Sequence, residues 1–185
     1  MHNPDNNIML IQPIHVKDDS MSKESAISAF VEHDHDHNAC RGEALGRAEM
    51  ICEARGVRLT ETRRRVLEHV WRGHKPLGAY EILDMLRDER QKTAPPTVYR
   101  ALDFLLEHGL IHRIESLNAF VGCTDPETPH RAQFLICEQC GTTAELNDPR
   151  IDAAISEQAQ IAGFSVNRRT IEVEGVCPHC TATGA

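Results

Sequence analysis

Two pairs of cysteines constrain this chain more than any other feature of its sequence. Each pair has the spacing CxxC, once in FLICEQCG at 134–141 and once in EGVCPHC at 174–180, and 36 residues separate the pairs. Two CxxC turns can supply four thiolates at tetrahedral positions, which is the closed coordination of structural zinc. The predicted ligands of such a site are Cys137, Cys140, Cys177 and Cys180.

The segment between the two pairs is longer than the ~15–20 residues that separate the pairs of a compact zinc ribbon. The patterns RAQFLICEQC and TTAEL predict two strands, and FSVNRRTIEVEGV predicts a third. Between them, DPRIDAAISEQAQIAG predicts a helix that Asp148 caps, with its isoleucines on one side. We therefore expect an α+β domain at 132–185, in which the ends of two strands meet and zinc stabilises a small core.

A redox site or a set of disulfides accounts for the cysteines less well than a metal site does. A thioredoxin-like active site uses one CxxC and leaves the second pair without a role. Disulfides are typical of exported proteins, but the first 20 residues lack the basic segment and the long apolar run of a signal peptide. The chain also has no run of ~18 apolar residues that would predict a membrane-spanning helix. We predict a cytoplasmic protein whose paired cysteines bind metal.

The N-terminal half is predicted to be helical from Glu43 onward, after a polar tail at 1–41 that lacks helical periodicity and is expected to be mostly disordered. Its clearest helix is APPTVYRALDFLLEHG at 94–109, with one apolar stripe. The stripe consists of Val98, Ala101, Leu102, Leu105 and Leu106. Two short strands, LIHRIE and NAFVG, follow as a β-hairpin. Helices followed by a hairpin indicate a winged-helix domain, here at 42–122, although a plain helical bundle fits the periodicity equally well.

The charge distribution restricts where this chain could bind nucleic acid. The net charge of −8 argues against indiscriminate binding, but residues 1–42 carry −4, residues 43–115 carry +1 and residues 116–185 carry −5. Any contact with DNA is therefore expected in the middle third. There, Tyr99 and Arg100 face outward near the start of the predicted helix, and arginine is the commonest reader of guanine edges.

A second set of metal donors brackets the segment 123–131, which we interpret as a hinge between the two domains. It consists of His112, Cys123, His130 and Glu145. One sulfur, two nitrogens and one oxygen form a borderline-soft donor set that suits zinc. Each of these residues alone would have an ordinary structural role, and their spacing by itself does not establish a site.

These motifs together resemble the ferric uptake regulator superfamily and, more narrowly, its zinc uptake regulator branch. The resemblance rests on PPTVYRALDFLLEHGLIHRIES, on VGC through PHRAQFLICEQCG and on the terminal CPHC, and it covers about residues 43 to 181. It implies a dimeric repressor of zinc-uptake genes, with a winged helix that binds operator DNA and a C-terminal dimerisation domain. It also implies two zinc ions per subunit, with the four cysteines as the structural site and the hinge set as the sensory site.

The resemblance adds two functional expectations on the preceding helix, AYEILDMLRDE. Tyr80 becomes a further candidate for DNA contact, and Asp84 with Arg87 becomes a candidate contact between two dimers on one operator. The alternative for the charged pair is a weak contact within the helix. Three consecutive arginines, Arg63 to Arg65, are candidates for contact with phosphate.

Three alternative functions compete with zinc regulation. Iron-, manganese- and peroxide-sensing relatives carry a histidine-rich stretch before the first cysteine pair, where this chain has PHRAQF, and a thiolate in a four-ligand set favours zinc. A zinc deaminase would need HxE followed by PCxxC, and neither motif occurs. A zinc-ribbon interaction module would leave outward Tyr99 and Arg100 without a role. His33, His35, His37 and Cys40 remain unassigned.

Overall fold

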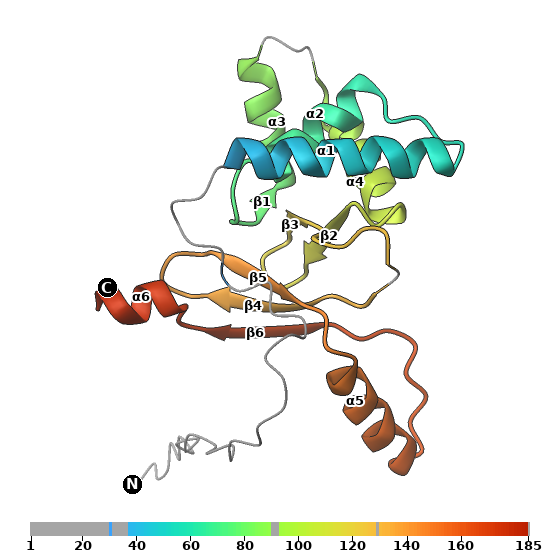
Figure 1. The fold of residues 1–185 in the computed structure, drawn as a ribbon, viewed down its shortest axis with the longest axis vertical. Helices are drawn as coiled ribbons and strands as arrows, with labels where there is room; N and C mark the ends of the chain where they lie inside the picture. Colours follow the sequence, from blue (N-terminus) through green and yellow to red (C-terminus); the bar gives the residue numbers. More distant parts are fainter. Residues whose placement is uncertain (1–29, 31–36, 90–92, 129, 185) are drawn as a thin grey trace, which may run out of the picture.

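The computed structural model describes Phe30 and residues 37–89, 93–128 and 130–184. A helical layer lies above a small wing, and the wing lies above a second sheet from whose ends α5 and α6 extend (Figure 1). Most of the predicted tail, residues 1–29 and 31–36, lies outside the described residues. The predicted winged helix and α+β domain are both present.

Four helices form the upper layer and enclose the largest hydrophobic core. They are α1 (His37–Ala54), α2 (Glu61–Val70), α3 (Ala79–Asp88) and α4 (Pro95–Glu107). The first helix begins six residues before Glu43, because its first turn, HNAC, contributes no buried side chain and so gives no periodic signal. Thr60 stands at the N-cap position of α2, but its side chain makes no capping hydrogen bond.

The apolar stripe of α4 is close to the predicted one, with one exchange. Its buried residues are Val98, Ala101, Leu102, Phe104 and Leu105. Leu106 is only half-buried, whereas Phe104 packs under the guanidinium of Arg63, 3.5 Å from the ring centroid, and beside the His108 ring. Tyr99 and Arg100 lie on the exposed side, as predicted.

The wing is a three-stranded antiparallel sheet of order β1-β3-β2. Strands β2 (Ile111–Ile114) and β3 (Ala119–Gly122) form the predicted hairpin. Strand β1 (Leu77–Gly78) was not predicted, because two residues are too few to show an alternating pattern. The indole of Trp71 presses on the end of β3, where a Cβ at Gly122 would lie 2.2 Å from Trp71 Cε2, so only glycine fits there.

The lower sheet has the order β5-β4-β6. It consists of β4 (Gln133–Cys137), β5 (Thr143–Leu146) and β6 (Ile171–Gly175), and α5 (Pro149–Ile161) joins β5 to β6. Strand β6 runs parallel to β4, with Cys137 opposite Gly175. Because parallel strands end at the same edge, the second cysteine pair, continued by α6 (Pro178–Thr183), returns beside the first.

The lower sheet differs from the sequence prediction in two respects. Only residues 171–175 of the long predicted strand are extended and paired. The helix α5 is capped by Asp148, whose side chain accepts the backbone N–H of Arg150, as predicted, but it buries none of its residues within this chain. Ile155 is 37% exposed and Ile161 is 73% exposed, so the apolar side of α5 faces outward. Among the described residues, no helix combines the length and the apolarity needed to cross a bilayer.

Candidate metal centres and nucleic-acid surface

The two CxxC turns bring their four sulfur atoms together. The second turn stands where the lower sheet ends and β6 leads into α6 (Figure 1). All four Sγ atoms lie within 4.8 Å of one another. The distance between Sγ of Cys140 and Sγ of Cys177 is 3.8 Å. A disulfide needs about 2.05 Å, whereas a tetrahedral ion with Zn–S bonds of about 2.3 Å separates its sulfurs by roughly 3.8 Å. The spacing therefore suits a shared metal ion and not a disulfide.

Backbone N–H groups point at these sulfurs. The N–H of Cys177 donates to Sγ of Cys137 at 3.3 Å, and the N–H of Cys180 donates to Sγ of Cys177 at 3.5 Å. Hydrogen bonds from the backbone of Cys140 and of Cys177 lower the pKa of the Cys137 thiol to about 6. Burial, and then hydrogen bonds with the other three cysteine side chains and the negative charge of Cys137, raise the pKa of the Cys180 thiol to about 12, so four neighbouring thiolates are in conflict. A divalent cation would remove this conflict and allow all four thiols to ionise.

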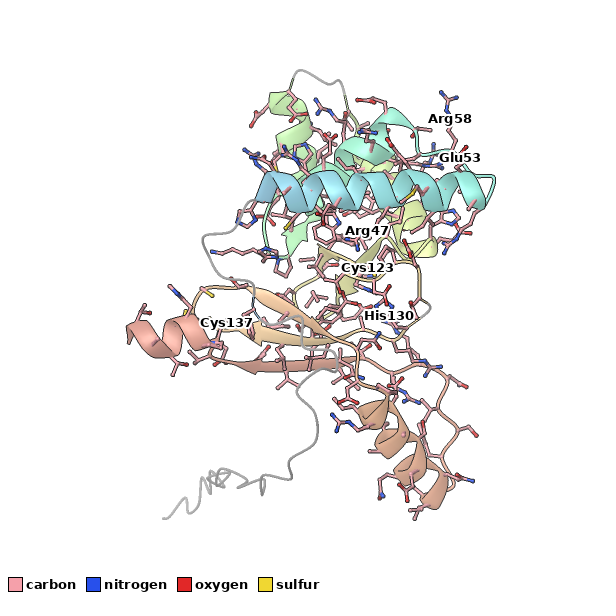
Figure 2. All side chains as sticks on the ribbon, in the orientation of Figure 1. Arg47, Glu53, Arg58, Cys123, His130 and Cys137 are labelled. Atoms are coloured by element: carbon pink, nitrogen blue, oxygen red, sulfur yellow. The ribbon has the colours of Figure 1, made fainter. Side chains whose placement is uncertain are left out.

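The hinge set also converges, although its members come from different elements. His112 lies on β2, Cys123 directly follows β3, His130 precedes β4 and Glu145 lies on β5. The four donor atoms lie within 4.8 Å of one another, and Cys123 and Glu145 are buried. Figure 2 shows Cys123 and His130 below the helical layer and well away from Cys137, so the two donor clusters are separate sites.

Two distances in the hinge set are close to those around a small tetrahedral ion, whereas the 2.5 Å between Nε2 of His130 and Oε1 of Glu145 is that of a hydrogen bond. Sγ of Cys123 lies 3.7 Å from Nε2 of His130, and Oε1 of Glu145 lies 3.1 Å from Nε2 of His112. Zinc with bonds of about 2.0–2.3 Å would separate its ligands by roughly 3.3–3.8 Å. The contact of His112 lacks the alignment of a hydrogen bond, which leaves a buried ring nitrogen without a hydrogen-bond partner among the described residues. A metal ion is the group that such a nitrogen accommodates.

The surroundings of the hinge set determine which of its side chains are ionised. Burial alone would raise the pKa of Glu145, but the adjoining His112 ring, the N–H of Thr124 and His130 lower it to about 2. Burial, and then the negative charge of Glu145, raise the pKa of the Cys123 thiol to about 12. The site thus holds one carboxylate and one protonated thiol, and a bound cation would displace the thiol proton.

The orientation of His130 is fixed by its second nitrogen. Nδ1 lies 2.7 Å from the carbonyl oxygen of Thr128, and because a carbonyl only accepts, Nδ1 carries a proton. Nε2 therefore points into the cluster, 2.5 Å from Oε1 of Glu145. Burial alone would lower the pKa of His130, but hydrogen bonds to Thr128 and Glu145 raise it. Such outer hydrogen bonds are typical of metal-binding histidines.

Two threonines support the hinge set and were not singled out in the sequence. The N–H and the hydroxyl of Thr124 donate to Oε2 of Glu145 at 2.9 and 2.8 Å. Thr128 orients His130 through its carbonyl, which any residue could provide. Only the position of Thr124, next to Cys123, gave a signal in the sequence that could have found it.

The surface predicted to meet DNA is exposed on α3 and α4. Tyr80 is 67% exposed and Tyr99 is 43% exposed, and the guanidinium of Arg100 makes no hydrogen bond or ion pair with another described residue. The arginines of α2 are engaged within the chain instead. Arg64 pairs with Glu49 and Glu68, and Arg65 pairs with Glu68 and Glu89. Their predicted role toward phosphate therefore gains no support from this geometry.

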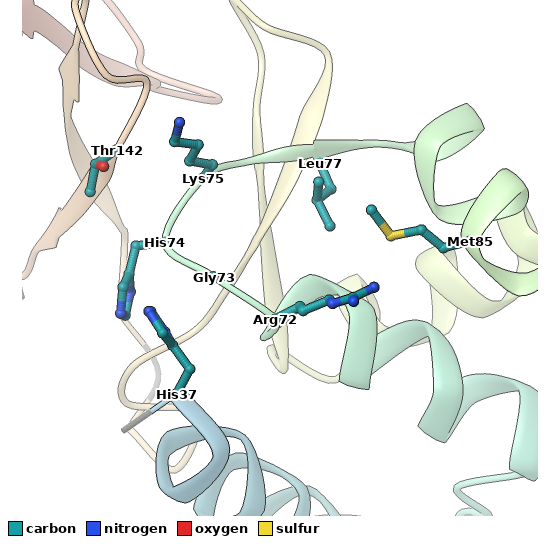
Figure 3. Close-up of a pocket in the computed structure, with 8 residues that line it drawn as sticks. All are labelled: His37, Arg72, Gly73, His74, Lys75, Leu77, Met85 and Thr142. Carbon is teal, nitrogen blue, oxygen red and sulfur yellow. The ribbon is translucent and has the colours of Figure 1, made fainter. Parts of the chain in front are cut away.

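Three further predicted residues lie away from both clusters. Asp84 and Arg87 are exposed on α3, with 3.5 Å between Arg87 Nη1 and Asp84 Oδ1, an i,i+3 contact within the helix. His37 begins α1, and its ring is tilted by 42° to that of His74, with 5.1 Å between the ring centroids, at one wall of a pocket of about 300 Å³ (Figure 3). Neither His37 nor His74 belongs to a metal-donor cluster among the described residues.

A winged helix whose hinge holds a buried sulfur–nitrogen–oxygen donor cluster defines a class of protein, the metal-responsive DNA-binding regulators. Comparison with known proteins is consistent with this class. Residues 54–174 match the ferric uptake regulator family. The zinc uptake regulation protein of Escherichia coli K12 is 39% identical over 144 residues, which are 77% of this chain and 84% of that protein. The chain belongs to the ferric uptake regulator family, whose members are regulators of transcription and not enzymes.

Two solved structures share both the fold and a substantial part of the sequence. A zinc uptake regulator complexed with zinc and DNA is 38% identical, with a TM-score of 0.73 over 78% of this chain and 97% of that one. The holo form of XcZur is 42% identical, with a TM-score of 0.69 over 76% of this chain and 98% of that one.

Proposed function

We propose that this protein is a zinc-responsive transcriptional regulator, whose zinc-loaded dimer binds operator DNA and represses genes for zinc uptake. The observation that carries the proposal is the hinge cluster, because its four donors come from both domains and include a buried thiol. The similarity to a regulator complexed with zinc and DNA supports the same function. A regulator that acts on operator DNA would work in the cytoplasm.

The donor chemistry favours zinc over iron or manganese. Iron(II) and manganese(II) prefer six ligands, chiefly oxygen and imidazole nitrogen, whereas a thiolate in a set of four suits zinc. We assign two zinc ions to each subunit. Cys137, Cys140, Cys177 and Cys180 would hold the structural ion, and His112, Cys123, His130 and Glu145 would hold the sensory ion.

The sensory residues act by holding two domains in one orientation. His112 belongs to the wing, in the domain 42–122, and Glu145 belongs to the domain 132–185. Cys123, at the exit of the wing, and His130 lie in the hinge 123–131. Bound zinc would supply the charge that keeps these donors together. With the donors held, the recognition helix of each subunit keeps a fixed position, which favours binding to two half-sites one DNA turn apart. With the donors apart, the domains sample more orientations and binding costs more entropy.

A homodimer explains the exposed apolar surface of the C-terminal domain. The exposed large hydrophobic side chains there are Ile155, Ile161, Phe164, Val173 and Val176. They lie on α5, on β6 and on the segments beside these elements, and apolar surface of this extent is usually covered by a partner. A second copy of the chain, related by a two-fold axis, would cover it with the same residues.

Operator binding measured with and without zinc tests the proposed function. We expect the purified dimer to bind a duplex from the promoter of a zinc-uptake gene more tightly when zinc is added, and a scrambled duplex equally weakly in both conditions. Iron(II) or manganese(II) at the same free concentration should not reproduce the gain. A gain with iron or manganese but not with zinc would assign the protein to another branch of the family.

Arg100 is expected to read a base edge in that complex. Replacing Arg100 with alanine should weaken binding to the operator by ~1–3 kcal/mol and barely change binding to a scrambled duplex, because only the operator presents the matching purine edge. Arg150→Ala on α5, the same change of charge in the other domain, is the matched control. Equal loss on both duplexes, with a shallower salt dependence, would reduce Arg100 to a phosphate contact.

Asp84 and Arg87 are proposed to bridge two dimers on one operator. Because both side chains are exposed and the pair is self-complementary, each residue can meet the opposite charge of a neighbouring dimer. Asp84→Arg and Arg87→Asp should each lower the cooperativity of operator binding, and the double exchange should restore part of it. Unchanged Hill slopes in all three variants would leave only the contact within α3, worth ~0.2–0.5 kcal/mol.

A further inference from the structure

Arg47 connects the helical layer to the backbone beside the hinge cluster. It projects from the side of α1 that faces Cys123 (Figure 2), and its Nη1 donates a hydrogen bond to the carbonyl oxygen of Thr124 at 3.2 Å. The two residues are separated by 77 positions in the sequence. The bond therefore ties α1 to the segment through which the chain leaves the wing.

Thr124 is held from its other side by a ligand of the hinge set. Its N–H and its hydroxyl both donate to Oε2 of Glu145, while Oε1 of the same carboxylate faces His112 and His130. One carboxylate thus divides its oxygens between the donor cluster and Thr124. If this carboxylate rotates, its hydrogen bonds with Thr124 change, and Thr124 is the residue whose carbonyl Arg47 binds. We call this chain of hydrogen bonds the Arg47–Thr124–Glu145 bridge.

The surroundings of Arg47 indicate that packing does not explain its presence. Its Nε is buried and has no hydrogen-bond partner among the described residues. A buried donor without a partner lowers stability, so an apolar side chain of similar length would be the more stable choice. The side chain also lines a cavity with Trp71 and Glu145. Because Arg47 lowers stability and lies beside the metal ligand Glu145, we infer that it is present for a functional reason.

We propose that Arg47 is a positioning residue that couples the hinge site to α1, so that occupancy of the donor set fixes the orientation of the DNA-binding domain. The inference rests on the proposed function of the hinge set as the zinc sensor. When the four donors are held together, Glu145 keeps one direction, Thr124 is fixed, and Arg47 holds α1 against the fixed backbone. When the donors separate, Glu145 turns, the Thr124 carbonyl moves, and α1 loses this attachment.

Arg47→Met tests the bridge, because methionine keeps an unbranched apolar stem and removes the guanidinium. We expect the variant to fold, to dimerise and to bind as much zinc as the parent. Its zinc-dependent gain in operator affinity should fall about tenfold, the order expected for one charge-assisted hydrogen bond. Arg47→Lys, which can still donate to the Thr124 carbonyl, should restore part of the gain.

Arg55→Met is the matched control. Arg55 lies on the same helix and also donates to a backbone carbonyl, that of His108 at 2.8 Å, but its bond stays within the helical layer. The control should change operator affinity with and without zinc by the same factor. Zinc binding can be followed in every variant through Trp71, the only tryptophan of the chain, since its indole contacts Gly122, the residue before Cys123.

A double variant separates a bridge from two independent effects. Thr124→Val removes the hydroxyl that binds Glu145, so in a common bridge the loss in Arg47→Met with Thr124→Val should be smaller than the product of the single losses. An undiminished zinc-dependent gain in Arg47→Met, or equal weakening with and without zinc, would overturn the inference. A parent with no zinc-dependent gain would overturn the proposed function as well, which distinguishes the two failures.

Discussion

Cys137→Ser is expected to leave a chain with little folded C-terminal domain and almost no dimer. Structural zinc contributes ~10–16 kcal/mol of binding free energy in small zinc domains, which equals or exceeds the ~5–15 kcal/mol by which whole proteins are stable. The loss should be severe here because the lower sheet contributes only Phe134 and Ile136 to a small core, which it shares with Ile114 of the wing. Circular dichroism melts and size-exclusion chromatography measure both effects.

Cys40→Ser is the matched control for this experiment. Cys40 lies on α1, is partly exposed and belongs to neither donor cluster. It should leave the melting temperature, the dimer and the zinc content unchanged. Cys180→Ser should repeat the loss seen with Cys137→Ser, because both thiols belong to the same tetrahedron. If the Cys137→Ser protein melts and elutes like the parent, the four cysteines do not form a structural zinc site.

The cysteine site could be predicted from the sequence because its spacing carries chemical information. Two CxxC turns that meet can supply four thiolates at tetrahedral positions. The sequence predicted that the ends of two strands meet. It did not predict that β4 and β6 are the pair or that they run parallel, which is what brings the turns together. Residue patterns indicate strands, but they do not indicate which strands are neighbours or in which direction they run.

Most of the buried residues of the helical layer could be predicted from the sequence. Periodicity identified the buried stripe of α4 but exchanged Phe104 for Leu106, because Arg63 covers the aromatic ring and no pattern within α4 records a residue of α2. The two-residue strand β1 gave no signal, since it exists only by pairing with β3. Both differences come from contacts between distant parts of the chain.

The hinge set shows where sequence reasoning reaches its limit. The four donors were named on their chemistry and on a family resemblance, and only the fold brings β2, the hinge and β5 to one point. The bond from Arg47 to Thr124 could not be inferred, because a backbone carbonyl and an arginine 77 residues away have no common pattern. Ligands carry a chemical signature in the sequence, whereas the residues that position them do not.

Cys123→Ser is expected to abolish the response to zinc without unfolding the protein. The serine hydroxyl does not ionise at neutral pH, so the hinge set loses its only thiolate. Zinc should then bind there about 100-fold more weakly or worse, since removal of an outer hydrogen-bond partner alone costs ~10–100-fold. The variant should keep one zinc ion per chain at the cysteine site and should bind operator DNA equally with and without added zinc. Metal analysis and mobility-shift titrations measure these outcomes.

The pH dependence of zinc binding provides an independent readout of the same variant. Burial and Glu145 raise the pKa of Cys123 to about 12, so the thiol is protonated at neutral pH and zinc must displace that proton. Lowering the pH therefore favours the metal-free state, and each proton released weakens zinc binding about tenfold per pH unit. Cys123→Ser should release one proton fewer than the parent and than the Cys40→Ser control. If Cys123→Ser releases as many protons and still gains operator affinity with zinc, the sensory ion lies elsewhere in the chain.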